Sequence, residues 1–225
     1  MAGIAHTAGR AVGGGERAWE DLVRRYSGLL RSVAADYRLW VPDSKPMYEA
    51  NVEGTREILV EAVTDPGRSL RERQTAAHSL QILKDGPDAA ELVRLYEEAP
   101  EEVRPLVMAS FGRAGPSRRI DDILIESAVA VGDRRLRSNA TLAIGFRIVN
   151  LPKSDARDLG ERTAMLVRSA GPESSAEMLK YLGLAAMQDG PVRDAVRELS
   201  RTAPTGGAVQ VAIAANPALR TAAGL

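Results

Sequence analysis

Three nine-residue segments of this chain align without gaps: Arg-Gln-Thr-Ala-Ala-His-Ser-Leu-Gln (73–81), Arg-Pro-Leu-Val-Met-Ala-Ser-Phe-Gly (104–112) and Arg-Ser-Asn-Ala-Thr-Leu-Ala-Ile-Gly (137–145). The second and third begin 31 and 33 residues after the one before. Each segment has an apolar residue three places after its arginine, a tiny residue at six and a large apolar residue at seven. The positions at three and seven share one helix face, and the tiny residue lets a neighbouring helix approach closely. The pattern therefore predicts a helix of one type that recurs along the chain.

Signals that break helices recur between these segments. Pairs or triplets that contain Gly, Pro or Asp begin 14 to 21 residues apart, from Asp65-Pro66-Gly67 to Ala203-Pro204. Glycine just after a helix and proline in the first turn of the next are typical of helix boundaries. No run alternates as a half-buried strand does, and the nearest one, Val209 to Ile213, contains alanine that favours a helix. We expect an all-α fold.

The period and the Arg-x-x-Ala-x-x-Ala-Leu-Gly-like pattern resemble short HEAT-type helical repeats over about residues 68–216. Fainter copies follow at 175–183, where Ser175 replaces the arginine, and at 206–214. The resemblance implies four or five helical hairpins stacked into an α-solenoid, because a single hairpin cannot bury its own apolar face. An irregular helical domain is the alternative.

The segment from Gly15 to Leu39 predicts one long amphipathic helix. Its apolar residues, Trp19 and Tyr26 among them, recur every three or four positions, and Pro42 follows its end. The run Gly-Glu-Arg-Ala-Trp-Glu-Asp-Leu-Val-Arg-Arg-Tyr (15–26) resembles region 2.1 of extracytoplasmic-function (ECF) sigma factors. This resemblance implies RNA polymerase as a candidate partner. After Leu39 the chain departs from that family, and the alternative is a helix that covers the end of the solenoid.

Charge is balanced overall, with 30 basic and 30 acidic residues, which argues against a general nucleic-acid or polybasic membrane binder. Residues 101–170 carry 12 basic and 9 acidic residues. The candidate partner-binding residues are Trp19 and Tyr26 of the first helix together with five of these basic residues. The five are Arg118, Arg119, Arg134, Arg135 and Arg137. Asp121, Asp122 and Asp133 stand beside them and would neutralise part of their charge, and Arg137 is also interpreted as a residue that stabilises its repeat.

The sequence offers little for catalysis. It has no Cys and two His, His6 and His78, with no ligands at metal spacing and no phosphate-binding glycine loop. We expect no catalytic residues, no metal, no cofactor and no enzymatic activity. The N-terminus has no apolar core of a signal peptide and no run is long enough to span a membrane, so we expect a cytoplasmic protein.

These observations predict a flexible tail (1–14), an amphipathic helix (15–45) and a HEAT-like α-solenoid (46–225). The expected function is a non-catalytic protein-interaction scaffold, with a possible role in transcription regulation if the first helix keeps a sigma-like contact. One alternative is an ECF sigma-like factor that binds RNA polymerase, and another is a HEAT-like DNA-binding or DNA-repair protein. The protein partner is unknown. The Ala-rich end, Ala208 to Leu225, has Arg220 as its one charge and predicts self-association or docking of a partner.

Overall fold

The computed structural model describes residues 56–81, 87–188 and 190–225. The chain divides into two compact units, residues 1–86 and 87–225, and each is described by itself. The predicted domain boundaries at 14/15 and 45/46 lie outside the described residues, as does the helix predicted for 15–39 with Trp19 and Tyr26.

In the first unit, residues 56–64 are helical and a turn over 65–69 leads to α4 (Leu70–Leu80). Ser69 and Glu72 form a capping box at the start of α4, in which the backbone N–H of Glu72 donates to Ser69 Oγ (3.3 Å) and the backbone N–H of Ser69 donates to the Glu72 carboxylate (3.0 Å). Ala76 and Leu80 of the first aligned segment are buried.

The second unit consists of helices joined by short connections: α5 (Ala89–Glu98), α6 (Arg104–Ser110), the 3₁₀ turn η1 (Phe111–Arg113), α7 (Arg118–Ala128), α8 (Arg134–Asn150), α9 (Lys153–Ser169), α10 (Pro172–Leu179), α11 (Gly183–Met187), α12 (Pro191–Thr202), α13 (Ala208–Ala215) and α14 (Pro217–Ala223). Every regular element among the described residues is helical, which confirms the predicted all-α class. The stretch Val209 to Ile213 lies within α13, as its alanine content predicted.

The helices begin where the sequence places its breaks. Pro172 and Pro191 occupy the first positions of α10 and α12, each after a glycine. Asp88, Ser117 and Asp133 each accept a backbone N–H in the first turn of α5, α7 and α8.

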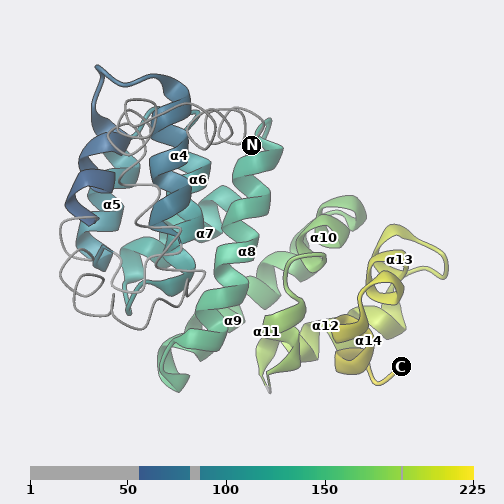
Figure 1. Ribbon diagram of the computed structural model, residues 1–225. Helices are drawn as coiled ribbons and strands as arrows, with labels where there is room; N and C mark the ends of the chain where they lie inside the picture. Colours follow the sequence, from purple (N-terminus) through teal and green to yellow (C-terminus); the bar gives the residue numbers. More distant parts are fainter. Residues whose placement is uncertain (1–55, 82–86, 189) are drawn as a thin grey trace, which may run out of the picture. The chain divides into compact units, whose positions relative to one another are not determined.

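The helices of the second unit contact one another in two series. One series runs α5, α7, α9 and α12, and each of these helices packs against the next. In the other, α6 and η1 pack against α8, α8 against α11, and α11 against α14, while α10 packs against α13 (Figure 1). Helices of the two series also pack on each other, as α7 does on α8.

The arginine that begins each aligned segment has a repeated role. Arg73 donates from Nε to the carbonyl of Arg68 (3.2 Å), and Arg104 donates from Nε to that of Ala99 (3.1 Å), in both cases five residues earlier. Arg137 Nη1 donates to the carbonyl of Ala130 (3.0 Å), seven residues earlier. Each arginine thus donates to a carbonyl at or beyond the end of the preceding helix. Such carbonyls receive no hydrogen bond from an N–H group of that helix.

The serine that replaces arginine in the fourth segment makes the same kind of contact. Ser175 Oγ lies 3.1 Å from the carbonyl of Ala170, five residues earlier, and 2.8 Å from that of Val167. A buried hydroxyl on this closer helix therefore reaches the carbonyls that the longer arginine reaches elsewhere.

Glycines that end the aligned segments mark close contacts between helices. A Cβ on Gly112 would lie 3.0 Å from Cβ of Phe146, one on Gly145 would lie 3.0 Å from the carbonyl oxygen of Tyr181, and one on Gly183 would lie 3.1 Å from Asn216. Gly112 thus meets α8, Gly145 meets the connection before α11, and Gly183 meets the N-cap of α14. The backbones are close there because glycine has no side chain.

Candidate functional site

The candidate arginines separate into two groups in the structure. Arg118 and Arg119 begin α7, where Arg118 Nη1 lies 2.9 Å from Asp158 of α9 and Arg119 Nη2 lies 2.9 Å from Glu97 of α5. The hydrogen bond to Glu97 raises the pKa of Arg119. Asp122 adds a contact to Arg118 at 3.3 Å. These two arginines therefore join α7 to its neighbours on both sides.

The second group begins α8. Arg134 Nε lies 3.2 Å from one oxygen of Glu177 on α10, and Arg137 Nη2 lies 3.4 Å from the other. Arg135 is exposed and pairs with no carboxylate among the residues that the structure describes. Asp133, expected to neutralise this group, instead accepts the backbone N–H of Leu136 at 2.8 Å. One carboxylate thus serves two guanidinium groups.

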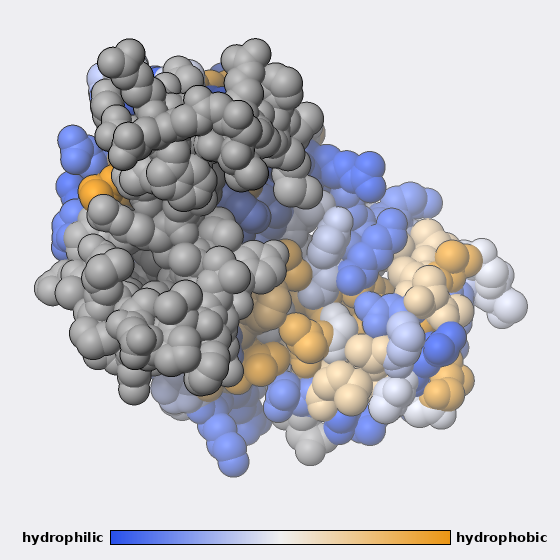
Figure 2. All heavy atoms as spheres, viewed as in Figure 1, coloured by the Kyte–Doolittle hydropathy of each residue, from blue (hydrophilic) through white to orange (hydrophobic). Residues whose placement is uncertain are grey.

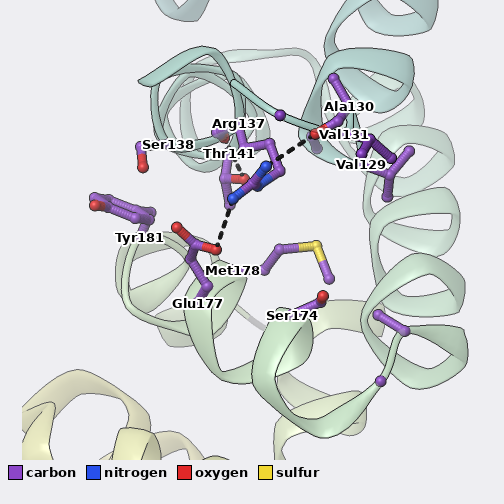
Figure 3. A pocket seen from close by; sticks show the side chains of 14 residues that line it. Val129, Ala130, Val131, Arg137, Ser138, Thr141, Ser174, Glu177, Met178 and Tyr181 are labelled. Carbon is purple, nitrogen blue, oxygen red and sulfur yellow. Dashed lines mark hydrogen bonds and ion pairs between the residues drawn. The ribbon is translucent and has the colours of Figure 1, made fainter. Parts of the chain in front are cut away.

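Arg137 of this second group and the shared carboxylate of Glu177 line a pocket of about 390 Å³, and Arg134 meets the pocket through its ion pair with Glu177. The connection between α7 and α8 forms one side of the pocket, and α10 with the residues before it forms the other. Figure 3 shows Arg137 between the carbonyl of Ala130 and the carboxylate of Glu177, with the side chain of Met178 extending beside them. The pocket therefore combines an apolar lining with a guanidinium–carboxylate pair.

The α7–α8 connection is apolar although it faces solvent. It reads Val129-Ala130-Val131-Gly132, and the side of the pocket that it forms includes all four residues. Val131 is 99% exposed and Val129 46%. Gly132, with φ +93°, adopts a left-handed conformation that turns the chain toward α8. Sequence reasoning singled out the arginines but missed these valines, whose signal was an apolar run at a helix boundary.

A buried ion pair stands apart from the pocket. Arg147 of α8 is fully buried, and its Nε donates to Asp121 Oδ1 of α7 at 2.7 Å. Its Nη1 donates to the carbonyls of Phe111 (3.0 Å) and Ala114 (2.9 Å), where η1 ends. Burial raises the pKa of Asp121, and the charge and hydrogen bond of Arg147 offset part of that rise. The donors of Arg147 are directed into the protein, so this pair braces α7, α8 and η1.

The C-terminal helices carry few charges. Arg220 is the one charged residue of α13 and α14. Val211 is 58% exposed, and Figure 2 shows apolar residues gathered over this part of the second unit. It is the segment for which the sequence predicts self-association.

Within the described ranges, no cluster of three or more His, Asp or Glu side chains has the arrangement of a metal site. No helix there has both the length and the apolar character of a membrane span. A comparison of the chain with protein-family models, curated proteins and solved structures finds no match.

Proposed function

We propose that this chain is a non-catalytic interaction scaffold, and that the helices of its second unit form a short HEAT-like α-solenoid. Two features support the solenoid. Arginine or serine at one aligned position contacts carbonyls of the chain before it, and glycine at another lies close to the next helix of the same series or to the residues that lead into it. Contacts that recur with the sequence period are what a stack of repeats requires, since each repeat meets only its neighbours.

The observation that carries the interaction role is the exposure of Val131. A side chain that is 99% exposed buries almost no apolar surface, so it adds almost nothing to the stability of the fold. It lies in an apolar connection beside a pocket of about 390 Å³. Connections held on a rigid helical framework are common places for binding residues, and apolar residues gathered at a pocket favour a partner that covers them. We assign partner docking to this pocket.

A selection experiment tests this role. A phage-displayed library of random peptides is selected on the immobilised full chain, and the enriched clones are measured on variants. We expect Val131→Ser to reduce their binding about tenfold, since a docked apolar contact is lost. The control is Val149→Ser, at a half-exposed valine of α8 outside the pocket. Clones that bind both variants equally, or no enriched clones at all, would contradict the assignment.

The alternative of a sigma-like factor rests on residues 15–39, which lie outside the described residues. Its proposed partner is RNA polymerase. A pull-down of purified core polymerase by the full chain, compared with a chain that lacks residues 15–39, tests this alternative, and no retention at micromolar concentration would remove it.

The DNA-binding alternative depends on the arginines of α7 and α8. Arg118 and Arg119 each have a carboxylate at 2.9 Å, so a phosphate would have to displace an ion pair at both of them. The geometry therefore favours a protein partner over nucleic acid.

A further inference from the structure

We infer that the pocket between the α7–α8 connection and α10 takes a short peptide segment that is apolar at its centre and acidic at its flanks. This inference rests on the proposed function and names the chemistry of the partner. It follows from the lining of the pocket and from the charges at its border.

The lining accounts for the apolar centre. Val129, Ala130 and Val131 line one side of the pocket and Met178 the other, and Ala128 and Ala170 add to its apolar surface. A volume of about 390 Å³ lies near the lower end of the range for ligand sites, about 300–1,000 Å³. It suits one or two aliphatic side chains of a peptide. Methionine adapts its shape to different apolar partners, because its chain is unbranched and flexible.

The positive charges next to the pocket account for the acidic flanks of the peptide. Arg134 and Arg137 share the single carboxylate of Glu177, which leaves one guanidinium charge uncompensated. Arg135 adds a second, since it has no carboxylate partner in the described part of the chain. Asp133, the remaining acid of this segment, accepts a backbone N–H in the first turn of α8.

Arg134 lies beside the pocket, because its carboxylate partner Glu177 is one of the lining residues. The side chain of Arg134 is 76% exposed while that of Glu177 is 23% exposed, so the positive charge faces solvent more than the negative charge does. A carboxylate on the docked segment would form charge-assisted hydrogen bonds with Arg134 or Arg135. A basic segment would be repelled, which gives the site selectivity as well as affinity.

Three fluorescein-labelled heptapeptides test the inference by fluorescence anisotropy on the full chain. All share Leu-Val-Leu at the centre, and their flanks are Asp-Glu, Ser-Gln or Lys-Arg on both sides. We expect the acidic probe to bind about tenfold more tightly than the neutral one, and the basic probe to bind most weakly. Raising the salt concentration from about 50 mM to 500 mM should remove most of the advantage of the acidic probe.

Variants locate the effect. The double variant Arg134→Glu/Arg135→Glu should weaken the acidic probe at least about tenfold and affect the neutral probe far less. The control is Arg157→Glu, because Arg157 is 77% exposed and paired with Glu161 much as Arg134 is paired with Glu177. Arg157 lies 13 residues before Ala170 of the pocket lining, which is about 20 Å along the axis of α9. Circular dichroism verifies that each variant folds.

The outcomes separate the inference from the proposed function. Equal binding of the acidic and neutral probes, with both lost in Val131→Ser, would overturn the acidic preference and leave the docking role intact. Failure of all three probes to bind at about 1 mM would overturn the inference, while the phage selection decides the docking role independently. Tighter binding of a labelled oligothymidylate than of any peptide, lost in the double variant, would replace the peptide with nucleic acid.

Discussion

Replacement of Arg147 by methionine should destabilise the second unit strongly. The change keeps an unbranched side chain of similar length but removes every donor of the buried guanidinium. Asp121 then keeps a buried carboxylate without its partner at 2.7 Å, and the carbonyls of Phe111 and Ala114 lose their hydrogen bonds. Removing one member of a buried ion pair costs about 3–5 kcal/mol. At about 2–4 °C per kcal/mol, the melting temperature should fall by roughly 6–20 °C.

Urea unfolding followed by far-ultraviolet circular dichroism measures the loss. A second variant, Arg147→Met/Asp121→Leu, removes both charges, and we expect it to recover about 1–3 kcal/mol relative to Arg147→Met alone. The recovery is incomplete because the carbonyl of Ala114 still lacks the donor that Arg147 supplied. The double variant also provides the measurement if the single variant is too unstable to fold.

The loss should depend on pH. In Arg147→Met, burial raises the pKa of Asp121 and the charge and hydrogen bond of Arg147 no longer oppose that rise, which leaves only the smaller effect of the Arg162 charge against it. A carboxyl whose pKa is raised in the folded state stabilises that state when protonated, and this stabilisation disappears as the pH rises through the raised pKa. The free-energy difference between the wild type and Arg147→Met should therefore be largest at pH 7 and smaller at about pH 4, near the pKa of Asp in an unfolded chain.

The result that would refute this reasoning is a loss below about 1 kcal/mol at pH 7. A loss of the same size at pH 7 and pH 4 would also contradict it, because the buried carboxylate would then contribute nothing. If the double variant were less stable than Arg147→Met, Asp121 would be satisfied by groups other than Arg147.

Three further outcomes follow from the packing. Gly145→Ala should lower the free energy of unfolding by about 1–2 kcal/mol, because its Cβ would lie 3.0 Å from a backbone carbonyl. Gly160→Ala in α9 should raise it by about 0.5–1 kcal/mol through helix propensity, because its Cβ would make only an ordinary contact with Pro191 at 3.6 Å. Equal effects of the two changes in urea unfolding would argue against close contact at Gly145. Arg104→Ala should cost about 1 kcal/mol through the lost hydrogen bond to Ala99, and Arg113→Ala, at an exposed residue, less than about 0.5 kcal/mol. Sedimentation velocity at about 100 μM should show self-association that Val211→Asp abolishes, since Val211 is 58% exposed; a monomeric wild type would count against the C-terminal contact.

Much of the fold could be predicted from local signals. The Gly-Pro pairs at 171–172 and 190–191 begin helices in the structure as they do in the sequence interpretation. The end of α10 was not predicted, because Lys180 to Leu182 contain neither glycine nor proline. The carbonyl of Tyr181 lies against Gly145 there, and such a tertiary contact leaves no trace in local propensity.

The candidate site was predicted only in part. Arg137 was interpreted as a residue that stabilises its repeat, which agrees with its hydrogen bond to Ala130. Of the acids expected to neutralise the arginines, Asp122 pairs with Arg118. Glu177 was missed, because it stands 40 residues after Arg137 and neutralises it only through the packing of α10 on α8. Pairs of this kind depend on which helices meet, which the spacing along one helix does not report.

The arginine contacts have a consequence for how such a chain can change. Their acceptors are main-chain carbonyls, as at Arg68 and Ala99, so the residue that receives the bond can be of almost any type. A hairpin held in this way needs only its own arginine, or a serine on a closer helix. The side chain of the residue that accepts the hydrogen bond does not affect the contact. Units of this kind can be duplicated, exchanged or allowed to diverge while their junctions survive. Sequence similarity between such units is then lost sooner than the similarity of their folds.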